Sequence, residues 1–226
     1  MSTWVVVGSS LSVIEHADAV LDAFIDATTI AANAAIKLFE GRSGPDYFIA
    51  IDECAGIELQ QHIEAKVAQG TRFMSYSKSN LVNNIRGIGR LPGFEVNTPM
   101  PSILLDMGPL TTTYVPGEIV FAQYCGLAAM QYAIREGATE LVIVGCDGYP
   151  GDRPMVDFPV VTFDGKCGDS MGMVQTRTVI EPFMRSMVAQ CPDVEFVQFG
   201  RPLYTVDAPN YTVALEIVGG MPEAVA

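Results

Sequence analysis

A short apolar run that stops abruptly in polar residues constrains the fold of this chain more than any other feature. The segment is Glu140-Leu-Val-Ile-Val-Gly-Cys-Asp-Gly-Tyr149. A short continuous apolar run predicts a strand that is buried on both faces, as in a parallel sheet covered by helices. Parallel sheets bind ligands just beyond the carboxyl ends of their strands. Asp147 and Tyr149 are therefore expected at the mouth of a binding crevice.

Strand-like and helix-like segments alternate along the rest of the sequence. Further apolar runs predict strands over residues 4–7, 28–32, 47–51, 71–76, 102–106 and 194–199, with an additional edge strand over 211–218. Apolar residues at helical spacing predict helices from residue 12 onward and over 34–39, 57–68, 118–136 and 174–190. Ser12 and Glu15 fit a capping box at the start of the first helix. The alternation predicts an α/β fold with a Rossmann-like, doubly wound, mostly parallel sheet and helices on both faces.

One domain is expected to span residues 1–226. The hydrophobic content of 49% is enough for a substantial core in a chain of 226 residues. Two segments, 78–115 and 150–170, lack a clear period and carry many Gly, Pro and polar residues. We interpret the first as a long excursion over the sheet and the second as a binding loop or lid. The apolar segment 211–221 leaves two alternatives open, an edge strand or a contact in a homo-oligomer.

Charge and cysteine content disfavour several classes of protein. The formal net charge is −13, with no local basic patch, so a nucleic-acid partner is unexpected. The five cysteines are widely spaced without a C-x-x-C pair, which indicates reduced thiols rather than a disulfide framework or a zinc cluster. The start of the chain lacks a signal-peptide pattern, and no window approaches the ~18 apolar residues of a membrane span. We therefore expect a cytoplasmic protein with no membrane span.

The turn Gly8-Ser-Ser-Leu-Ser12 follows the first predicted strand and leads into a helix. Glycine lets the backbone turn sharply, and the amides at the start of a helix favour an anion. The turn therefore predicts a phosphate site formed by Gly8, Ser9 and Ser10. A plain strand-to-helix turn with a serine cap is the alternative, because the segment has neither the G-x-G-x-x-G pattern nor the Walker pattern.

Two more polar residues end predicted strands. Asn33 is expected either to contact a ligand or to cap the short helix that follows it. Asp52 ends its strand in the same way as Asp147 does. Two carboxylates at one crevice suit a magnesium ion or a catalytic base, and capping of the next helix is the alternative for Asp52.

The two histidines, His16 and His62, fall among charged residues in predicted helices. We expect both to be solvated surface residues, which leaves no histidine base near the crevice. Asp52 or Asp147 would then have to serve as the base. No tightly bound cofactor is expected, and magnesium held by those two carboxylates is the metal that the pattern suggests.

Three segments together resemble two related groups of proteins. The segment Val6-Val-Gly-Ser-Ser-Leu11 resembles the G-x-G-P-S-L start of the bacterial sialyltransferase-like glycosyltransferases. It also resembles the start of the group that contains archaeal 6-hydroxymethylpterin diphosphokinase and motility-associated proteins of similar fold. Thr29-Ile-Ala-Ala-Asn33, followed by Gly44-Pro-Asp-Tyr-Phe-Ile-Ala-Ile-Asp52, is similar to the second group. The stretch from Cys125-Gly-Leu-Ala128 to Asp147 is similar to both.

The resemblance implies a Rossmann-like sheet that binds a nucleotide, with Gly8, Ser10, Asn33, Asp52, Gly126 and Asp147 lining the site. The donor is a cytidine-monophosphate sugar in the first group and ATP with magnesium in the second. This chain departs from both patterns because Val6 and Ser9 replace a Gly and a Pro. No histidine follows residue 62, so the late catalytic histidine of the sialyltransferase-like group has no counterpart.

Three functions follow as alternatives. The first is a nucleotide-dependent transferase, glycosyltransferase-like, that uses a nucleotide-sugar donor. The second is a magnesium-dependent diphosphokinase-like enzyme that acts on a pterin or a similar small alcohol. The third is a non-catalytic nucleotide-binding protein, which the missing histidine favours.

Overall fold

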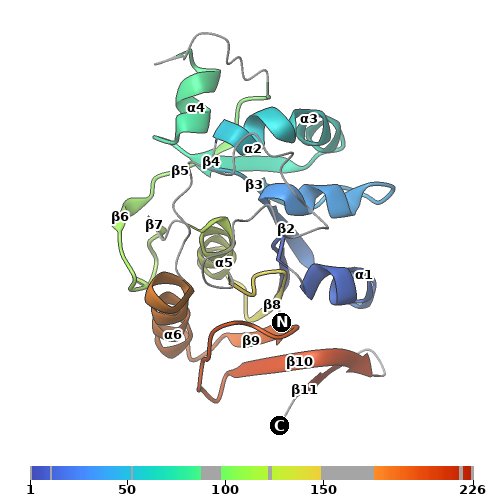
Figure 1. Ribbon diagram of the computed structural model, residues 1–226, viewed down its shortest axis with the longest axis vertical. Helices are drawn as coiled ribbons and strands as arrows, with labels where there is room; N and C mark the ends of the chain where they lie inside the picture. Colours follow the sequence, from blue (N-terminus) through green and yellow to red (C-terminus); the bar gives the residue numbers. More distant parts are fainter. Residues whose placement is uncertain are drawn as a thin grey trace.

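The computed structural model describes residues 2–10, 12–51, 53–87, 98–121, 124–148, 176–218 and 221–224. Two predicted site residues, Asp52 and Tyr149, lie outside these ranges, as does the predicted lid over 150–170. The roles assigned to them therefore stay predictions. Within the described ranges, one large sheet runs through the molecule from end to end (Figure 1).

The sheet is nine-stranded among the described residues, in the order β11-β10-β9-β8-β1-β2-β3-β4-β5. All neighbouring strands are parallel except the β10–β11 pair. The prediction of a mostly parallel sheet is therefore confirmed. The strands are β1 (Thr3–Val7), β2 (Thr28–Ala32), β3 (Tyr47–Ile49), β4 (Arg72–Tyr76), β5 (Ile103–Leu105), β8 (Glu140–Val144), β9 (Glu195–Phe199), β10 (Tyr211–Val218) and β11 (Met221–Ala224).

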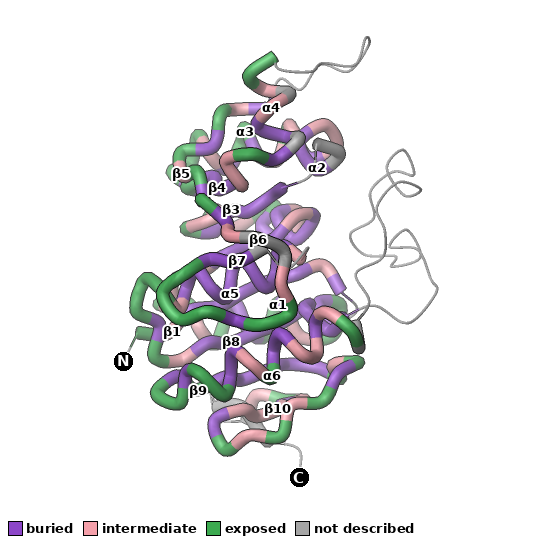
Figure 2. The backbone as a smooth tube through the Cα atoms, turned by 90° about the vertical axis from the view of Figure 1, so that its left-hand side faces the viewer, coloured by how far each residue is buried: buried purple, intermediate pink, exposed green. Residues whose placement is uncertain are grey.

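Helices cover both faces of the sheet, as the doubly wound fold requires. One face packs against α5 (Cys125–Arg135) and α6 (Glu181–Gln190). The other packs against α1 (Ser12–Ala23), the 3₁₀-helix η1 (Asn33–Phe39), α2 (Glu53–Glu58), α3 (Gln60–Ala68) and α4 (Asn80–Ile85). Buried residues accordingly run through the central strands and the facing sides of these helices (Figure 2).

Strand β1 explains why the apolar runs are continuous rather than alternating. Side chains of a strand point to opposite faces in turn. Trp4 and Val6 join the core beneath α5, whereas Val5 and Val7 join the core beneath α1. Every position of such a central strand is therefore buried, and an apolar residue is favoured at each.

Three helix predictions differ from the structure. The helix predicted over 118–136 begins only at Cys125, because Val120–Phe121 forms the short strand β7. This strand pairs with β6 (Gly108–Leu110), and the Gln131 side chain bonds both the amide and the carbonyl of Val120. The helix predicted over 57–68 lies within two separate helices, α2 and α3. In the described part of the helix predicted over 174–190, a π-helical turn, η3 (Thr176–Ile180), precedes α6.

The predicted edge strand over 211–218 is correct in its bounds but lies inside the sheet. Strand β10 pairs with β9 on one side and with β11 on the other. On this side of the sheet, the outermost described strand is therefore β11. Among the helices of the described ranges, none has the length and apolarity needed to cross a bilayer.

Candidate functional site

The strand order reverses between β1 and β8. The chain first lays down β2 to β5 on one side of β1 and later lays down β8 to β10 on the other side. Such a switch point leaves a crevice beyond the carboxyl ends of the two central strands, where α/β proteins bind their ligands. Gly8 follows β1 and Asp147 follows β8, so the two predicted site residues are brought to one place.

Gly8 allows the two strand ends to approach closely. A Cβ atom at this position would lie 2.1 Å from the carbonyl oxygen of Gly145. The Gly8 amide donates to Val144 O at 2.8 Å, and the Ser10 amide donates to Gly145 O at 2.9 Å. Two backbone donors of the predicted phosphate site therefore already have partners within the protein. The turn fastens the β1–α1 connection to the end of β8.

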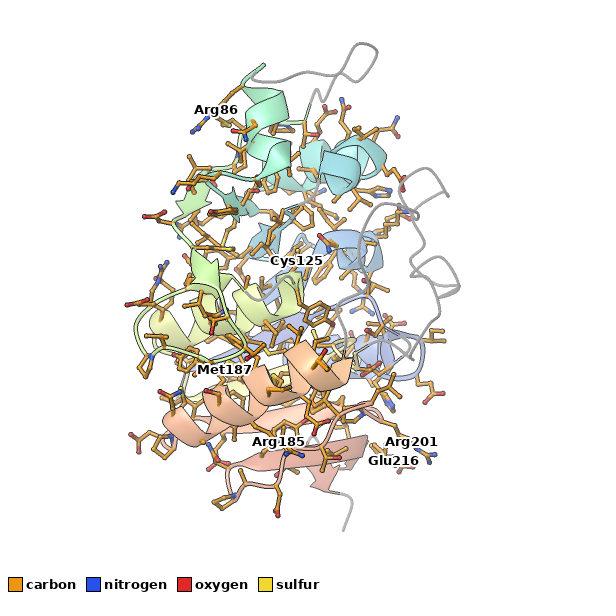
Figure 3. The ribbon with its side chains drawn as sticks, turned by 60° about the vertical axis from the view of Figure 1, so that its left-hand side comes forward. Arg86, Cys125, Arg185, Met187, Arg201 and Glu216 are labelled. Carbon is orange, nitrogen blue, oxygen red and sulfur yellow. The ribbon has the colours of Figure 1, made fainter. Side chains whose placement is uncertain are left out.

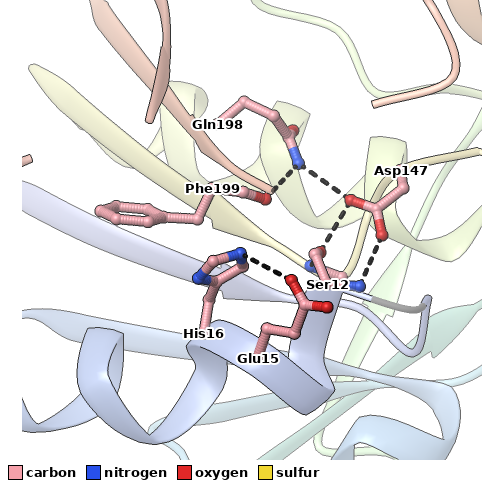
Figure 4. A network of polar contacts seen from close by, with 7 residues as sticks. Ser12, Glu15, His16, Asp147, Gln198 and Phe199 are labelled. Carbon is pink, nitrogen blue, oxygen red and sulfur yellow. Dashed lines mark hydrogen bonds and ion pairs between the residues drawn. The ribbon is translucent and has the colours of Figure 1, made fainter. Parts of the chain in front are cut away.

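Asp147 occupies the start of helix α1. Its side chain is buried, and its Oδ2 accepts the Ser12 amide at 2.8 Å while its Oδ1 accepts the Ser12 hydroxyl at 2.7 Å (Figure 4). The amino end of a helix stabilises a negative charge. Burial raises the pKa of the Asp147 carboxyl above its ordinary value, and the two bonds from Ser12 oppose that shift. The carboxylate therefore lies where the sequence predicted a bound anion.

The capping box predicted at this helix does not form. The Ser12 hydroxyl donates to Asp147 and accepts the Gly145 amide at 2.8 Å, instead of bonding the amide of Glu15. The cap is supplied by a residue 135 positions further along the chain. Sequence spacing alone does not reveal a cap of this kind.

Two buried polar residues that the sequence analysis did not single out extend the network. Gln198 Nε2 lies 3.4 Å from Asp147 Oδ1 and donates to Phe199 O at 3.2 Å (Figure 4). The Tyr204 hydroxyl lies 3.1 Å from Gln198 Oε1 and 3.2 Å from Cys146 O. The sequence offered one sign of this role, because Gln198 places an amide side chain inside the mostly apolar run 194–199. A buried amide needs polar partners.

The prediction for His16 is wrong. Its side chain is only 13% exposed, and its ring centroid lies 6.3 Å from that of Phe199. His16 Nε2 is buried, lies 3.6 Å from a Glu15 carboxylate oxygen and has no hydrogen-bond partner among the described residues. The His16 side chain therefore lies against β9 rather than in solvent. His62, by contrast, is partly exposed and pairs with Glu40 at 3.1 Å.

Gly126 and Gly8 are brought together around the thiol of Cys146. A Cβ atom on Gly126 would lie 2.8 Å from Cys146 Sγ, and one on Gly8 would lie 2.7 Å from it. Gly126 is the second residue of α5, so this helix also begins at the crevice. The cysteine prediction is confirmed for Cys125, Cys146 and Cys191, which are buried and form no disulfide; Cys125 lies deep inside the molecule in Figure 3.

Cys146 is expected to resist thiol reagents in the native protein. Burial raises the pKa of its thiol to about 12, and the thiolate is the reactive form. Labelling at mildly alkaline pH with a maleimide, followed by digestion and mass spectrometry, should leave the peptide that carries Cys146 unmodified. The same labelling in urea should modify it fully. Rapid modification in the native state would contradict the burial of this thiol.

Asn33 is the predicted site residue with the most unusual geometry. Its backbone φ is +51°, a left-handed conformation that asparagine tolerates better than most residues. Its Oδ1 is buried and has no hydrogen-bond partner among the described residues. It follows β2, which neighbours β1, so it lies at the same edge of the sheet as Gly8. A left-handed backbone and a buried acceptor that has no partner among the described residues together make Asn33 a candidate for ligand contact.

The predicted magnesium site is only partly described. Both oxygens of Asp147 already accept hydrogen bonds from Ser12, and Asp52 lies outside the described residues. No group of three or more His, Cys, Asp and Glu side chains that could hold a metal ion occurs within the described ranges. Magnesium binding therefore stays a prediction that depends on Asp52.

Sequence comparisons add no family assignment, because no protein-family model and no curated protein matches this chain. The strand order, which reverses between β1 and β8, defines an α/β protein with a Rossmann-like sheet. The resemblance to the sialyltransferase-like and diphosphokinase-like groups stays a prediction.

Proposed function

We propose that this chain is a nucleotide-dependent transferase that binds a nucleotide sugar at the switch point between β1 and β8. Support comes from the placement of Gly8, Asn33, Gly126 and Asp147 near the carboxyl ends of the central strands, where this fold class binds its ligands.

The observation that carries the proposal is that the buried Oδ1 of Asn33 has no hydrogen-bond partner in the part of the chain that the structure describes. A buried acceptor without a donor costs about 1–3 kcal/mol, and a left-handed backbone adds to that cost. A ribose hydroxyl is a hydrogen-bond donor and would satisfy this atom. Nucleotides are therefore the ligand class that the position suits.

Asp147 has a positioning role in this proposal. Its carboxylate holds the Ser12 end of α1 against β8, which fixes the wall of the crevice. A buried carboxylate whose oxygens are already bonded is a poor candidate for direct contact with a phosphate, because two anions repel each other. We therefore assign ligand contact to Asn33 and the turn residue Ser9, rather than to Asp147.

A second candidate is a nucleotide-binding protein without catalytic activity. The specific observation in its favour is that the amides of Gly8 and Ser10 already bond β8. A pocket that binds the nucleoside but makes few contacts to its phosphates would bind a nucleotide without activating the leaving group. Incubation with nucleotide sugars separates the two, since a transferase that lacks its acceptor hydrolyses its donor slowly.

Asn33 variants test the proposed site by thermal shift. The ligands are CMP, UMP, UDP, GDP, ADP and ATP, each with and without magnesium, because a ligand of the native state raises the melting temperature. Asn33→Gly removes the side chain and relieves the backbone. We expect its unliganded melting temperature to equal or exceed that of the wild type, whereas its affinity for the bound nucleotide falls about fivefold, the scale of one hydrogen bond.

Asn33→Ala is the matched control for backbone strain. It removes the same atoms but keeps a non-glycine residue at φ +51°, so we expect a loss of about 1 kcal/mol in stability. Both variants should weaken nucleotide binding to the same extent. Wild-type affinity in Asn33→Gly would remove Asn33 from the site, and no shift with any nucleotide would end the proposal.

A further inference from the structure

A cavity lies at the carboxyl ends of β4 and β5. Figure 1 shows these strands near the small sheet formed by β6 and β7. The volume of the cavity is about 670 Å³, within the range of about 300–1,000 Å³ that is typical of small-molecule sites. We call it the β4–β5 crevice. Its lining includes Tyr76, Lys78, Asp106, Glu118 and Arg135.

The β4–β5 crevice is lined by side chains of opposite charge that form no ion pairs with one another in the described part of the chain. Within the described ranges, the side chains of Lys78, Asp106 and Glu118 make no ion pair or hydrogen bond, and all three are exposed. The Arg135 guanidinium lies 5.1 Å from the centre of the Tyr132 ring and has its own partner in Glu136, at 3.5 Å. Two cationic and two anionic side chains therefore line one cavity, and their formal charges cancel.

The backbone fixes where three of these charged residues leave the sheet. The Ser77 amide donates to Leu105 O at 3.0 Å, so Lys78 and Asp106 leave the ends of neighbouring strands. The Gly108 amide donates to Ile119 O at 3.0 Å, which brings the segment before β7 against the residues after β5. Both carboxylates thus belong to the β6–β7 side of the crevice and the lysine to the β4 side.

Apolar side chains also line the crevice. Met107 and Ile119 line it and are 5% and 3% exposed, and Tyr76 adds an aromatic wall. A complementary ligand carries both a positive and a negative charge, no net charge and an apolar part. Few small molecules combine these properties, and α-amino acids with apolar side chains are the simplest of them.

We propose that the β4–β5 crevice binds a zwitterionic α-amino acid with an apolar or aromatic side chain. Lys78 binds its carboxylate, Asp106 and Glu118 bind its ammonium group, and Met107 and Ile119 contact its side chain. The inference does not rest on the proposed nucleotide site, because Asn33 and the switch point belong to other strand ends.

Calorimetric titration with a matched set of ligands tests the proposal. L-Phenylalanine and L-leucine are expected to bind in the micromolar to millimolar range. Phenethylamine lacks the carboxylate, 3-phenylpropanoate lacks the ammonium group and glycine lacks the apolar part. Each is expected to bind at least about tenfold more weakly, the scale of a hydrogen bond to a charged group. Equal binding of all five, or no heat with any at millimolar concentration, would overturn the proposal.

Paired variants locate the binding in the crevice. Lys78→Gln and Asp106→Asn should each weaken L-phenylalanine binding about tenfold. Arg86→Gln and Asp193→Asn are the controls, because both side chains are exposed and line no part of the crevice; Arg86 projects from the outer end of α4 (Figure 3). Binding that survives in Lys78→Gln and Asp106→Asn would also overturn the proposal. The nucleotide-induced thermal shift of Lys78→Gln should equal that of the wild type, which separates the two sites.

Discussion

Replacing Gly8 with alanine is expected to cost about 3 kcal/mol of stability or more, a large share of the free energy of unfolding of a typical domain. The new methyl group would lie 2.1 Å from Gly145 O and 2.7 Å from Cys146 Sγ. The carbonyl cannot retreat freely, because it accepts the Ser10 amide and belongs to the end of β8. Relief of the clash therefore requires β1 and β8 to separate at the switch point. Urea unfolding followed by circular dichroism measures the loss.

Gly108→Ala is the matched control for this change. Neither glycine has a positive φ, so both substitutions are free of backbone strain. A Cβ atom on Gly108 would meet Val120 Cγ1 at 3.6 Å, an ordinary van der Waals contact. We expect its stability to stay within about 0.5 kcal/mol of the wild type. If Gly8→Ala were equally mild, the close approach of the two strand ends would be wrong.

Asp147→Ala is expected to destabilise the protein by about 3 kcal/mol. The Ser12 amide and hydroxyl would both lose their acceptor in a buried place, and each unsatisfied donor costs about 1–3 kcal/mol. Asp147→Asn keeps one carbonyl acceptor and should cost less. Asp193→Asn changes an exposed carboxylate after α6 and should be neutral. Chemical denaturation of the three variants gives the ranking, and a neutral Asp147→Ala would contradict the network in Figure 4.

The pH dependence of the Asp147→Asn effect has a defined sign. Burial raises the pKa of Asp147 in the folded protein above 3.8, so the native state keeps this proton to higher pH than the unfolded state does. Stability from this group is therefore greatest below pH 3.8 and falls as the pH rises through the folded pKa. The stability of the wild type relative to Asp147→Asn should decline over that window. A relative stability that grows with pH would mean that the folded pKa is lowered.

Much of the fold followed from the sequence because central strands bury both faces. Runs such as residues 140–144 admit little besides a buried strand, and the helices between them showed a clear period. The small β6–β7 sheet was missed because its strands are very short and one contains proline. The start of α5 was misplaced because residues 118–124 are apolar enough to extend a helical pattern. Val120 and Phe121 instead pair with Gly108–Leu110, and the Gln131 side chain bonds Val120. Such contacts between separate parts of the chain cannot be read from local sequence.

The candidate site was less predictable than the fold. Strand ends gave Gly8, Asn33 and Asp147, because polar residues that interrupt apolar runs are visible in any sequence. Their partners were not visible, since the bonds from Ser12 to Asp147 and from Gln198 to Asp147 join distant parts of the chain. His16 was misjudged for the same reason: its neighbours within α1 are charged, but Phe199 of β9 covers it.

The two outermost strands of the sheet are short. Strand β5 has three residues and β11 has four, whereas β10 has eight and is paired on both sides. Free strand edges act as templates onto which foreign chains add, and long flat edges do so most readily. This chain offers only a few unpaired backbone groups at each end of its described sheet. Strand β11 pairs antiparallel with β10 and covers part of the edge of this eight-residue strand. We expect this pairing to reduce the tendency of β10 to add strands from other molecules.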